Sequence, residues 1–234
     1  MRGLRYMLMV IAAGLAGCAG SAPPYGVEQR LALPGTSQQV WAVAPAINLS
    51  GQKLDPVLQA DLLHQQLGRV EGLVPLPVNR VIDVFAALRI DQVQSAEQAA
   101  LVCDLLECDG LIVATITAFD PFDPPKLGAS LTLFRKDRSY QRPPNVDPRE
   151  LVRRAAPATA PVAARPAQLL QAVGMFDAAD GSTRQALLEY ARGRNDPSGP
   201  YRDRLYLVEM DRYCGFVYHQ LIGELLRRPG LAGG

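Results

Sequence analysis

Leu111-Ile112-Val113-Ala114-Thr115-Ile116-Thr117-Ala118 is the stretch that decides the fold. The run is rich in β-branched residues, carries no charge and follows the turn pair Asp109-Gly110, so it predicts a buried β-strand. Before it, residues 96–107 have the pattern of a helix, with Ser95 as N-cap in a sequence that resembles a reduced capping box. After it, residues 129–135 alternate between polar and apolar side chains, which predicts a half-buried antiparallel strand.

The stretch nearer the N-terminus predicts a second strand and helix. Residues 40–47 are apolar on both faces, as the residues of a central strand are. Asp55 then precedes Pro56, a pair typical of a helix N-terminus, so we expect a helix over residues 56–70. The next expected elements are a short strand at 73–78 and a helix that is capped by Asn79 and extends to residue 88.

Toward the C-terminus, we expect a strand at 168–177, a helix at 184–194 and a long helix, or a short strand running into a helix, at 204–228. The last element carries an apolar stripe, whose expected role is packing on the sheet; an exposed partner-binding face is the alternative. The order of elements predicts an α/β (α+β) fold: a mixed β-sheet of about four to five strands covered by helices, with additional C-terminal helices. We assign residues 37–230 to a single domain with a mobile Pro/Arg-rich insertion at 136–166.

The N-terminus has the features of an export signal. Arg2 and Arg5 precede a predominantly apolar run at 6–15, which is too short to span a bilayer and typical of a signal peptide. Leu15-Ala16-Gly17-Cys18 resembles the lipobox of bacterial lipoproteins. We therefore expect residues 1–17 to be a lipoprotein signal peptide and Cys18 to be acylated. An ordinary cleaved signal with a chance cysteine is the alternative.

Acylation of Cys18 predicts a place in the cell envelope. A diacylglyceryl group supplies two acyl chains, which is enough for stable membrane anchoring. Residues 18–36 are rich in Ala, Gly, Ser and Pro, so we expect a flexible tether that holds the domain up to roughly 60 Å from the bilayer. Ala19 follows the cysteine, and by resemblance to enteric lipoproteins this favours the outer membrane, with the protein facing the periplasm.

The charge balance argues against a nucleic-acid partner. The chain holds 24 basic and 23 acidic residues, and loss of Arg2 and Arg5 with the leader would leave the mature chain almost neutral. Residues 135–165 depart from this balance, because eight basic and three acidic residues give them a net charge of +5. A solvated loop is the favoured interpretation of this segment, and contact with anionic lipid or another acidic surface is the alternative.

Three cysteines remain beside Cys18. In an oxidising compartment, Cys103, Cys108 and Cys214 could supply one disulfide. Cys103 and Cys108 lie near an expected helix end at a spacing that is poor for a bond if the helix is continuous, whereas Cys214 could pair with either of them. Three small buried hydrophobic residues are the alternative. The chain has no CxxC motif and no Cys–His cluster, so no metal site is predicted.

No catalytic site and no cofactor are predicted. His64 and His219 are the two histidines of the chain, and neither lies near a nucleophile motif such as GxSxG. Walker, GxGxxG and HExxH motifs are absent from the sequence. Asp120 and Asp123 could form an acid–base pair, but aspartates among prolines are more typical of a turn.

The stretch from Asn48 to Gly51 is the candidate binding segment. It follows the expected strand at 40–47, and ligands of open α/β sheets bind beyond the carboxyl ends of the strands. Asn48, Ser50 and Gly51 are therefore the candidate binding residues. Ordinary turn chemistry is the favoured alternative.

Several short stretches resemble a group of bacterial envelope proteins. Val43 to Gly51 looks like the opening strand and turn of the penicillin-binding-protein activator lipoproteins, and of the related TolB N-terminal and curli-secretion lipoprotein domains. Leu106 to Val113, with the helix before it, and Phe176 to Gly181 are similar to later parts of these domains. The resemblance covers residues 38–182, without the insertion at 136–166, and the helices from residue 184 onward have no obvious counterpart.

This resemblance implies a non-enzymatic envelope domain that works by protein contact. We therefore expect a membrane-tethered interaction or assembly module in envelope biogenesis or secretion, with an envelope protein as partner. Its expected contact features are the turn at 48–51, the basic segment and the C-terminal helix. The alternatives are a small-ligand-binding lipoprotein and an enzyme with an unrecognised site.

Overall fold

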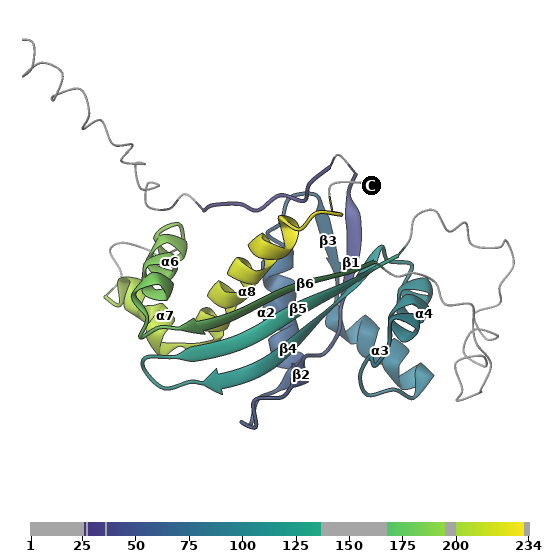
Figure 1. Ribbon diagram of the computed structural model, residues 1–234, viewed down its shortest axis with the longest axis horizontal. Coiled ribbons are helices and arrows are strands. Elements are labelled where there is room, and N and C mark those ends of the chain that lie inside the picture. The colour runs from purple at the N-terminus through teal and green to yellow at the C-terminus, as the bar shows by residue number, and fades with distance from the viewer. Residues whose placement is uncertain (1–25, 27, 36, 137–167, 195–199, 232–234) are drawn as a thin grey trace, which may run out of the picture.

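The computed structural model describes residues 26, 28–35, 37–136, 168–194 and 200–231. The expected leader and Cys18 lie outside the described residues, and so does the expected insertion at 136–166 apart from its first residue. The described chain forms a mixed β-sheet with helices on both faces, which confirms the predicted α/β (α+β) class (Figure 1).

The strands of this sheet are β1 (Gln39–Val43), β2 (Ile47–Asn48), β3 (Leu73–Leu76), β4 (Gly110–Asp120), β5 (Lys126–Arg135) and β6 (Gln168–Asp177). They lie in the order β3-β1-β4-β5-β6, and β2 pairs with the later part of β4. β1 is parallel to both β3 and β4, whereas β4, β5 and β6 are antiparallel neighbours. The decisive run at 111–118 therefore lies in the central strand β4.

The single strand expected at 40–47 is wrong, because this stretch forms two strands. The N–H of Ala44 donates to the carbonyl oxygen of Ile112 at 3.0 Å, but the next N–H on that side, that of Ala46, donates to the carbonyl oxygen of Pro56 at 3.0 Å and leaves the ladder. The chain returns to β4 at β2, where Ile47 faces Thr115. This division gives the sheet six strands where four to five were expected. β5 also begins earlier than the expected residue 129.

The helices are α2 (Pro56–Leu67), α3 (Val78–Leu88), α4 (Ala96–Leu106), α6 (Gly181–Arg192), α7 (Leu205–Val208) and α8 (Met210–Leu226), with a 3-10 turn η2 (Arg202–Arg204). Asp55, Ser95 and Asp180 accept hydrogen bonds from backbone N–H groups in the first turns of α2, α4 and α6. Such caps satisfy donors that a helix start leaves free. The capping box at α4 is displaced by one residue, because Gln98 Oε1 accepts from the N–H of Gln94.

The cap expected at Asn79 is wrong. α3 begins at Val78, two residues earlier than a cap at Asn79 implies, and Pro77 stands at its N-cap position without a side-chain hydrogen bond. Asn79 lies inside the first turn, where its Oδ1 accepts from the N–H of Arg80 at 2.9 Å. Because Val78 is buried, the packing of its side chain sets the start of the helix and overrides the local polar signal.

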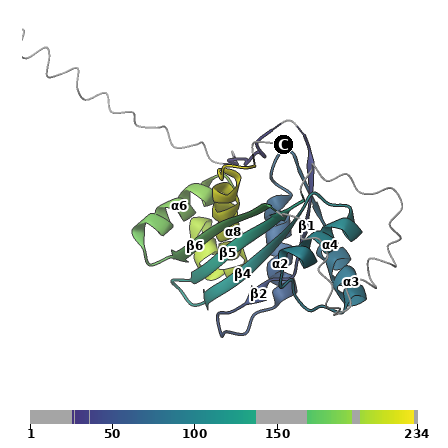
Figure 2. The ribbon, with the colours of Figure 1, turned by 45° about the vertical axis from the view of Figure 1, so that its right-hand side comes forward.

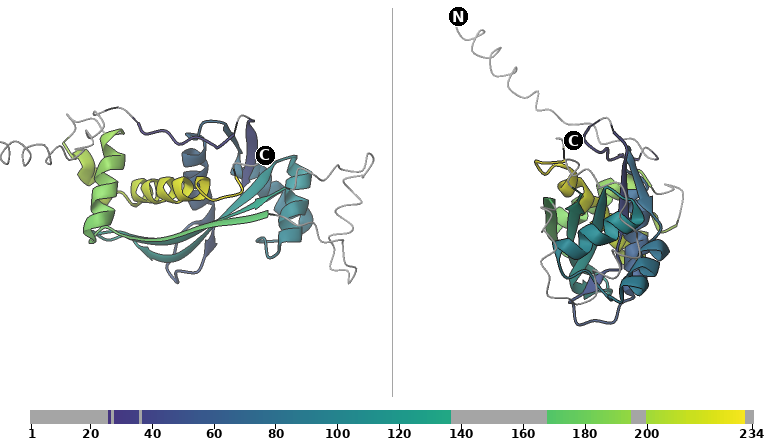
Figure 3. Two further views of the ribbon diagram at one scale, coloured as in Figure 1. Left: turned by 45° about the horizontal axis from the view of Figure 1, so that its top comes forward. Right: turned by 90° about the vertical axis from the view of Figure 1, so that its right-hand side faces the viewer.

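Two hydrophobic cores lie on opposite faces of the sheet. α2 and α8 pack on one face, in a core that contains Trp41 of β1 and Phe216 of α8. α3 and α4 pack on the other face, where Phe85 and Leu111 are buried. Figure 2 shows α3 and α4 grouped beside β1, and Figure 3 shows α8 lying along the long strands. Among the described helices, none therefore lies over the part of the second face that β6 contributes.

The apolar stripe of the C-terminal segment packs on the sheet, as predicted. Twelve of the residues in α8 are buried, and they include Tyr213, Phe216 and Leu221. The alternative of an exposed partner-binding face is therefore wrong. The expectation that the C-terminal helix is a contact feature is wrong for the same reason. The stretch expected as one element at 204–228 divides at Glu209, whose extended backbone (φ −103°, ψ 102°) separates α7 from α8.

Residues 28–33, which we call the strap, lie against the domain. The N–H of Leu33 donates to the carbonyl oxygen of Glu71 at 2.9 Å, and the N–H of Glu71 donates to that of Leu31 at 2.8 Å. Leu33 is buried, and Leu31 packs against the core. The flexible tether expected at 18–36 is therefore wrong for these residues. Leu31 and Leu33 are separated by one residue in an otherwise Ala/Gly/Pro-rich stretch, and this spacing is the signal that could have predicted the packing of the strap.

Candidate functional site

The candidate binding segment forms a self-contained turn. Asn48 Oδ1 accepts from the N–H of Ser50 at 3.0 Å and from its hydroxyl at 2.7 Å. Asn48 Nδ2 donates to the carbonyl oxygen of Gln52 at 2.8 Å. Gly51 has a φ of +73°, which glycine adopts without strain. The polar groups of Asn48 and Ser50 are used within the turn, and ligand binding at Asn48, Ser50 and Gly51 remains a prediction.

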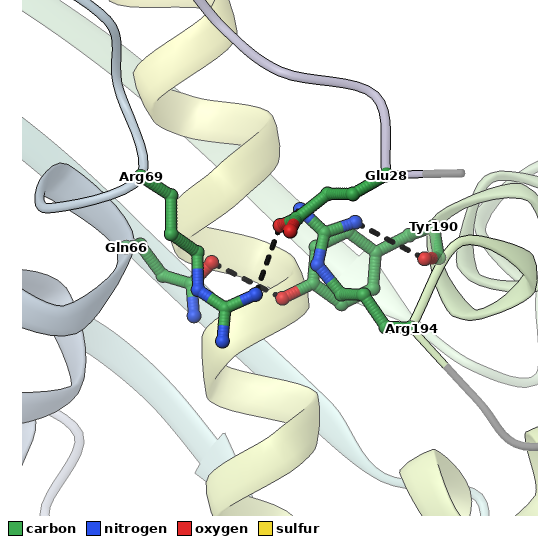
Figure 4. Close-up of polar contacts among 5 residues, drawn as sticks. All are labelled: Glu28, Gln66, Arg69, Tyr190 and Arg194. Atoms are coloured by element: carbon green, nitrogen blue, oxygen red, sulfur yellow. Dashed lines mark hydrogen bonds and ion pairs between the residues drawn. The ribbon is translucent and has the colours of Figure 1, made fainter. Parts of the chain in front are cut away.

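A charged cluster joins the strap to two helices (Figure 4). Arg69, just after α2, donates from Nη1 to Glu28 Oε1 at 2.8 Å, and Arg194, just after α6, places Nη2 2.6 Å from the same oxygen. The Arg194 side chain is only 8% exposed. We call Glu28, Arg69 and Arg194 the clamp. Figure 4 shows its three side chains meeting in front of α8, with the two arginines on either side of the carboxylate.

The clamp keeps Glu28 ionised. Burial on its own would raise the pKa of this carboxyl group, but the hydrogen bond from Arg69 and the charge of Arg194 outweigh it and hold the pKa of Glu28 below its ordinary value. Tyr190 positions Arg194 in turn, because the guanidinium lies 3.8 Å from its ring centroid and Nη1 donates to its carbonyl oxygen at 3.1 Å. The strap is thus held by two cations that share one carboxylate.

Two buried rings lie beside the clamp. Tyr190 Oη donates to Gln66 Oε1 at 3.1 Å, and burial raises the pKa of Tyr190 to about 12. The ring of His219, on α8, lies 5.0 Å from that of Tyr190. Burial and then the charge of Arg194 lower the pKa of His219 to about 4. Near pH 7 the histidine is neutral and the tyrosine protonated, so neither pKa suits proton transfer at that pH.

The clamp is expected to stabilise the fold through the charge of Glu28. Glu28→Gln keeps the shape of the side chain but leaves the buried Arg194 without its counter-ion, so we expect the free energy of unfolding to fall by about 1–3 kcal/mol. Urea denaturation measures this change. Arg30→Gln is the matched control, because Arg30 and Glu71 form an exposed ion pair 3.6 Å apart, which contributes about 0–1 kcal/mol. Equal losses in the two variants would contradict a structural role for the clamp.

The other groups considered as catalytic have structural surroundings. Asp120 Oδ1 accepts from the N–H of Phe122 at 3.1 Å, which is the hydrogen bond of an aspartate turn, and Asp123 follows in the same β4–β5 connection. His64 lies half-buried in the last turn of α2. Within the described ranges, no cluster of three or more His, Cys, Asp and Glu side chains could hold a metal ion. Nor does any helix there have the length and apolar character needed to cross a membrane.

The three described cysteines are buried and free. Cys214, on α8, lies in the core on one face of the sheet, whereas Cys103 and Cys108 lie in the core on the other face, so a disulfide between Cys214 and either of them is wrong. α4 ends at Leu106, and Glu107 takes the left-handed conformation (φ +56°). This turn brings Cys108 back towards Cys103, because the N–H of Cys108 donates to the carbonyl oxygen of Cys103 at 3.1 Å where the helix ends.

The outer face of β6 carries exposed apolar side chains. Leu169, Val173 and Met175 are 53%, 61% and 59% exposed. They alternate with the buried Leu170 and Ala172, so they lie on the face of the sheet opposite α8. The sequence predicted this strand but not its place at the sheet edge. Residues 168–176 contain no charged side chain, whereas a strand face that is exposed to water usually contains some. This lack of charge is the signal that could have indicated a contact surface.

Comparison with known proteins assigns no family to the chain. No protein-family model matches it, and no curated protein sequence does. The LpoB C-terminal domain from Salmonella enterica is similar over 61% of this chain and 85% of its own, with 10% identity and a TM-score of 0.41. A PelC dodecamer from Paraburkholderia phytofirmans covers 86% of this chain and 96% of its own, with 8% identity and a TM-score of 0.39. The hypothetical protein CT253 from Chlamydia trachomatis has 15% identity, a TM-score of 0.33, and coverages of 81% and 92%. Likenesses this distant carry no argument about function, which has to rest on the residues of this chain.

Proposed function

We propose that this protein is a non-enzymatic interaction module of the cell envelope, tethered to the outer membrane by acylation of Cys18 and facing the periplasm. Its partner is a protein, and its docking surface is the outer face of β6 together with the edge of β6 that no other described strand occupies. The resemblance of residues 38–182 to envelope lipoprotein domains and the lipobox-like sequence at Cys18 support the tether and the compartment.

One observation carries the proposal: three apolar side chains stand exposed on an edge strand. Leu169, Val173 and Met175 are each more than half exposed, although the described helices cover much of the rest of the sheet. Contiguous exposed apolar side chains are typical of protein contact sites. Lone exposed apolar residues, such as Val208 on α7, are common on protein surfaces and carry no such meaning.

A photoreactive amino acid at residue 173 of the full-length protein tests this proposal in native envelopes. We expect illumination to yield discrete protein adducts, because the side chain of Val173 would lie within the docked interface. The matched control is the same group at Val208, which is 54% exposed but lies on α7 rather than on β6 and should yield none. Absence of adducts at residue 173, or equal adducts at both positions, would count against the docking surface.

The same purified protein tests the anchor. Mass spectrometry is expected to find Cys18 as an acylated N-terminal residue. An unmodified residue 18, or an intact leader before it, would contradict the membrane tether. The docking surface would still be tested separately by the crosslinking at residue 173.

A further inference from the structure

The two edges of the sheet differ in how they are protected. β3, at one edge, is four residues long and contains Pro75, which offers no N–H to a further strand. The strap lies next to that edge, where Ala32 forms a parallel bridge with Glu71. β6, at the other edge, is ten residues long and contains no Lys, Arg or Pro. Proteins usually block long edges with such residues because unpaired N–H and C=O groups recruit another strand.

The edge of β6 with which no described strand pairs and the apolar face of β6 belong to one surface. Leu169 stands beside Phe134 of β5, and Met175 lies over Gly128, where an added Cβ would be 2.8 Å from the Met175 methyl carbon. The single acidic residue of β6, Asp177, lies at its end and pairs with Lys126 at 2.7 Å. A partner strand along this edge would therefore meet main-chain hydrogen-bonding groups and apolar side chains but no charge before the end of the strand.

The sequence of β6 is complementary to itself. In an antiparallel pair around a two-fold axis at Ala172, Leu169 of one copy faces Met175 of the other, and Gln171 faces Val173. The four side chains lie on the same face, since the register preserves the alternation along the strand. Because residues 168–176 carry no charge, this pairing opposes no like charges. A second copy fits this edge, because its own β6 is an uncharged strand of the same ten-residue length whose apolar side chains match in this register.

We propose that β6 pairs antiparallel with β6 of a second copy of this chain, around Ala172, and so joins two sheets into one. This inference rests on the proposed function and identifies the partner of the interaction module. It accounts for the missing protection of this edge and for the exposure of Leu169, Val173 and Met175 in the single chain.

A pair of cysteines in full-length protein, embedded in native envelopes, tests the register. In the chain carrying Leu169→Cys and Met175→Cys, mild oxidation is expected to give a disulfide-linked dimer, because the two positions face each other across the axis. Within one chain they are about 20 Å apart and cannot bond. The matched control carries Leu169→Cys and Val173→Cys, which do not face each other in this register and should give little dimer.

Val173→Lys in the same double-cysteine chain tests the surface itself. The two-fold axis places this lysine in the interface twice, so we expect the dimer yield to fall about tenfold or more. Val208→Lys is the control, and its yield should be unchanged. A dimer that persists with Val173→Lys would overturn the proposal.

The photoreactive group at residue 173 separates this proposal from the function on which it rests. Adducts with a copy of the chain support both. Adducts with a different protein, without the disulfide dimer, overturn the second copy but leave the interaction module standing. An adduct within the same chain overturns the second copy as well, since the edge would then be covered by the protein's own residues. No adduct and no dimer overturn both.

Discussion

Phe216→Ala is expected to lower the free energy of unfolding by about 3–5 kcal/mol. Phe216 is fully buried where α8 meets the sheet, and its ring contacts those of Phe176, Tyr190 and Tyr213 with centroids 5.9, 5.6 and 5.8 Å away. Truncation leaves a cavity and removes three ring contacts, each of which contributes about 0.5–1.5 kcal/mol beyond burial. Urea denaturation followed by circular dichroism measures the loss.

Phe216→Leu is the matched control for this prediction. Leucine refills most of the volume without the ring contacts, so we expect a loss about half as large or smaller. A loss below about 1 kcal/mol for Phe216→Ala would mean that α8 is not packed into the core as described. It would also restore the C-terminal helix as an available contact surface.

Acidification from pH 6.5 to 4.5 is expected to lower the free energy of unfolding by about 2–3 kcal/mol through His219. Burial and the charge of Arg194 lower the pKa of this histidine to about 4 in the folded protein, against about 6.5 when it is unfolded. The unfolded chain therefore binds the proton first as the pH falls. The stability conferred by the neutral histidine is fully present above pH 6.5 and is lost as the pH falls towards 4.

His219→Gln isolates this contribution, because glutamine does not titrate. We expect its unfolding free energy to change less than that of the wild type between pH 6.5 and 4.5. Glu28, which also faces this region, has a lowered pKa, so its own contribution begins to be lost only as the pH reaches its ordinary value of 4.5, at the end of this interval. Arginine side chains in general stay protonated over this range. Equal pH dependence in both proteins would show that His219 is not buried as a neutral group.

Local signals predicted the helices better than the sheet. Asp55 and Ser95 were identified as caps because a cap bonds residues two or three positions away, which a sequence displays directly. Asn79 misled the prediction because the burial of Val78, set by distant residues, decided where α3 begins. The first strand divides where the N–H of Ala46 donates to the carbonyl oxygen of Pro56, a contact that an apolar run does not reveal.

The docking surface and the clamp depend on contacts between distant parts of the chain. The pairing of β6 with β5 follows a long excursion, and nothing in the residues of β6 says that no described strand lies on its other side. Glu28 meets Arg194 only because α6 and the strap converge in front of α8. Such pairings leave no periodic pattern in the sequence. The strap was therefore assigned to the tether on its composition alone, and neither the docking surface nor the clamp was predicted.

The clamp also limits the length of the tether between Cys18 and the folded domain. With Cys18 acylated as proposed, the ten peptide steps to Glu28 span at most about 34 Å, little more than the apolar thickness of a bilayer, whereas a chain free to residue 36 would reach roughly 60 Å. Neighbouring copies would therefore lie at similar distances from the membrane and meet by lateral diffusion within one layer. Confinement to so thin a layer raises the frequency of encounters between their sheet edges without any added contact.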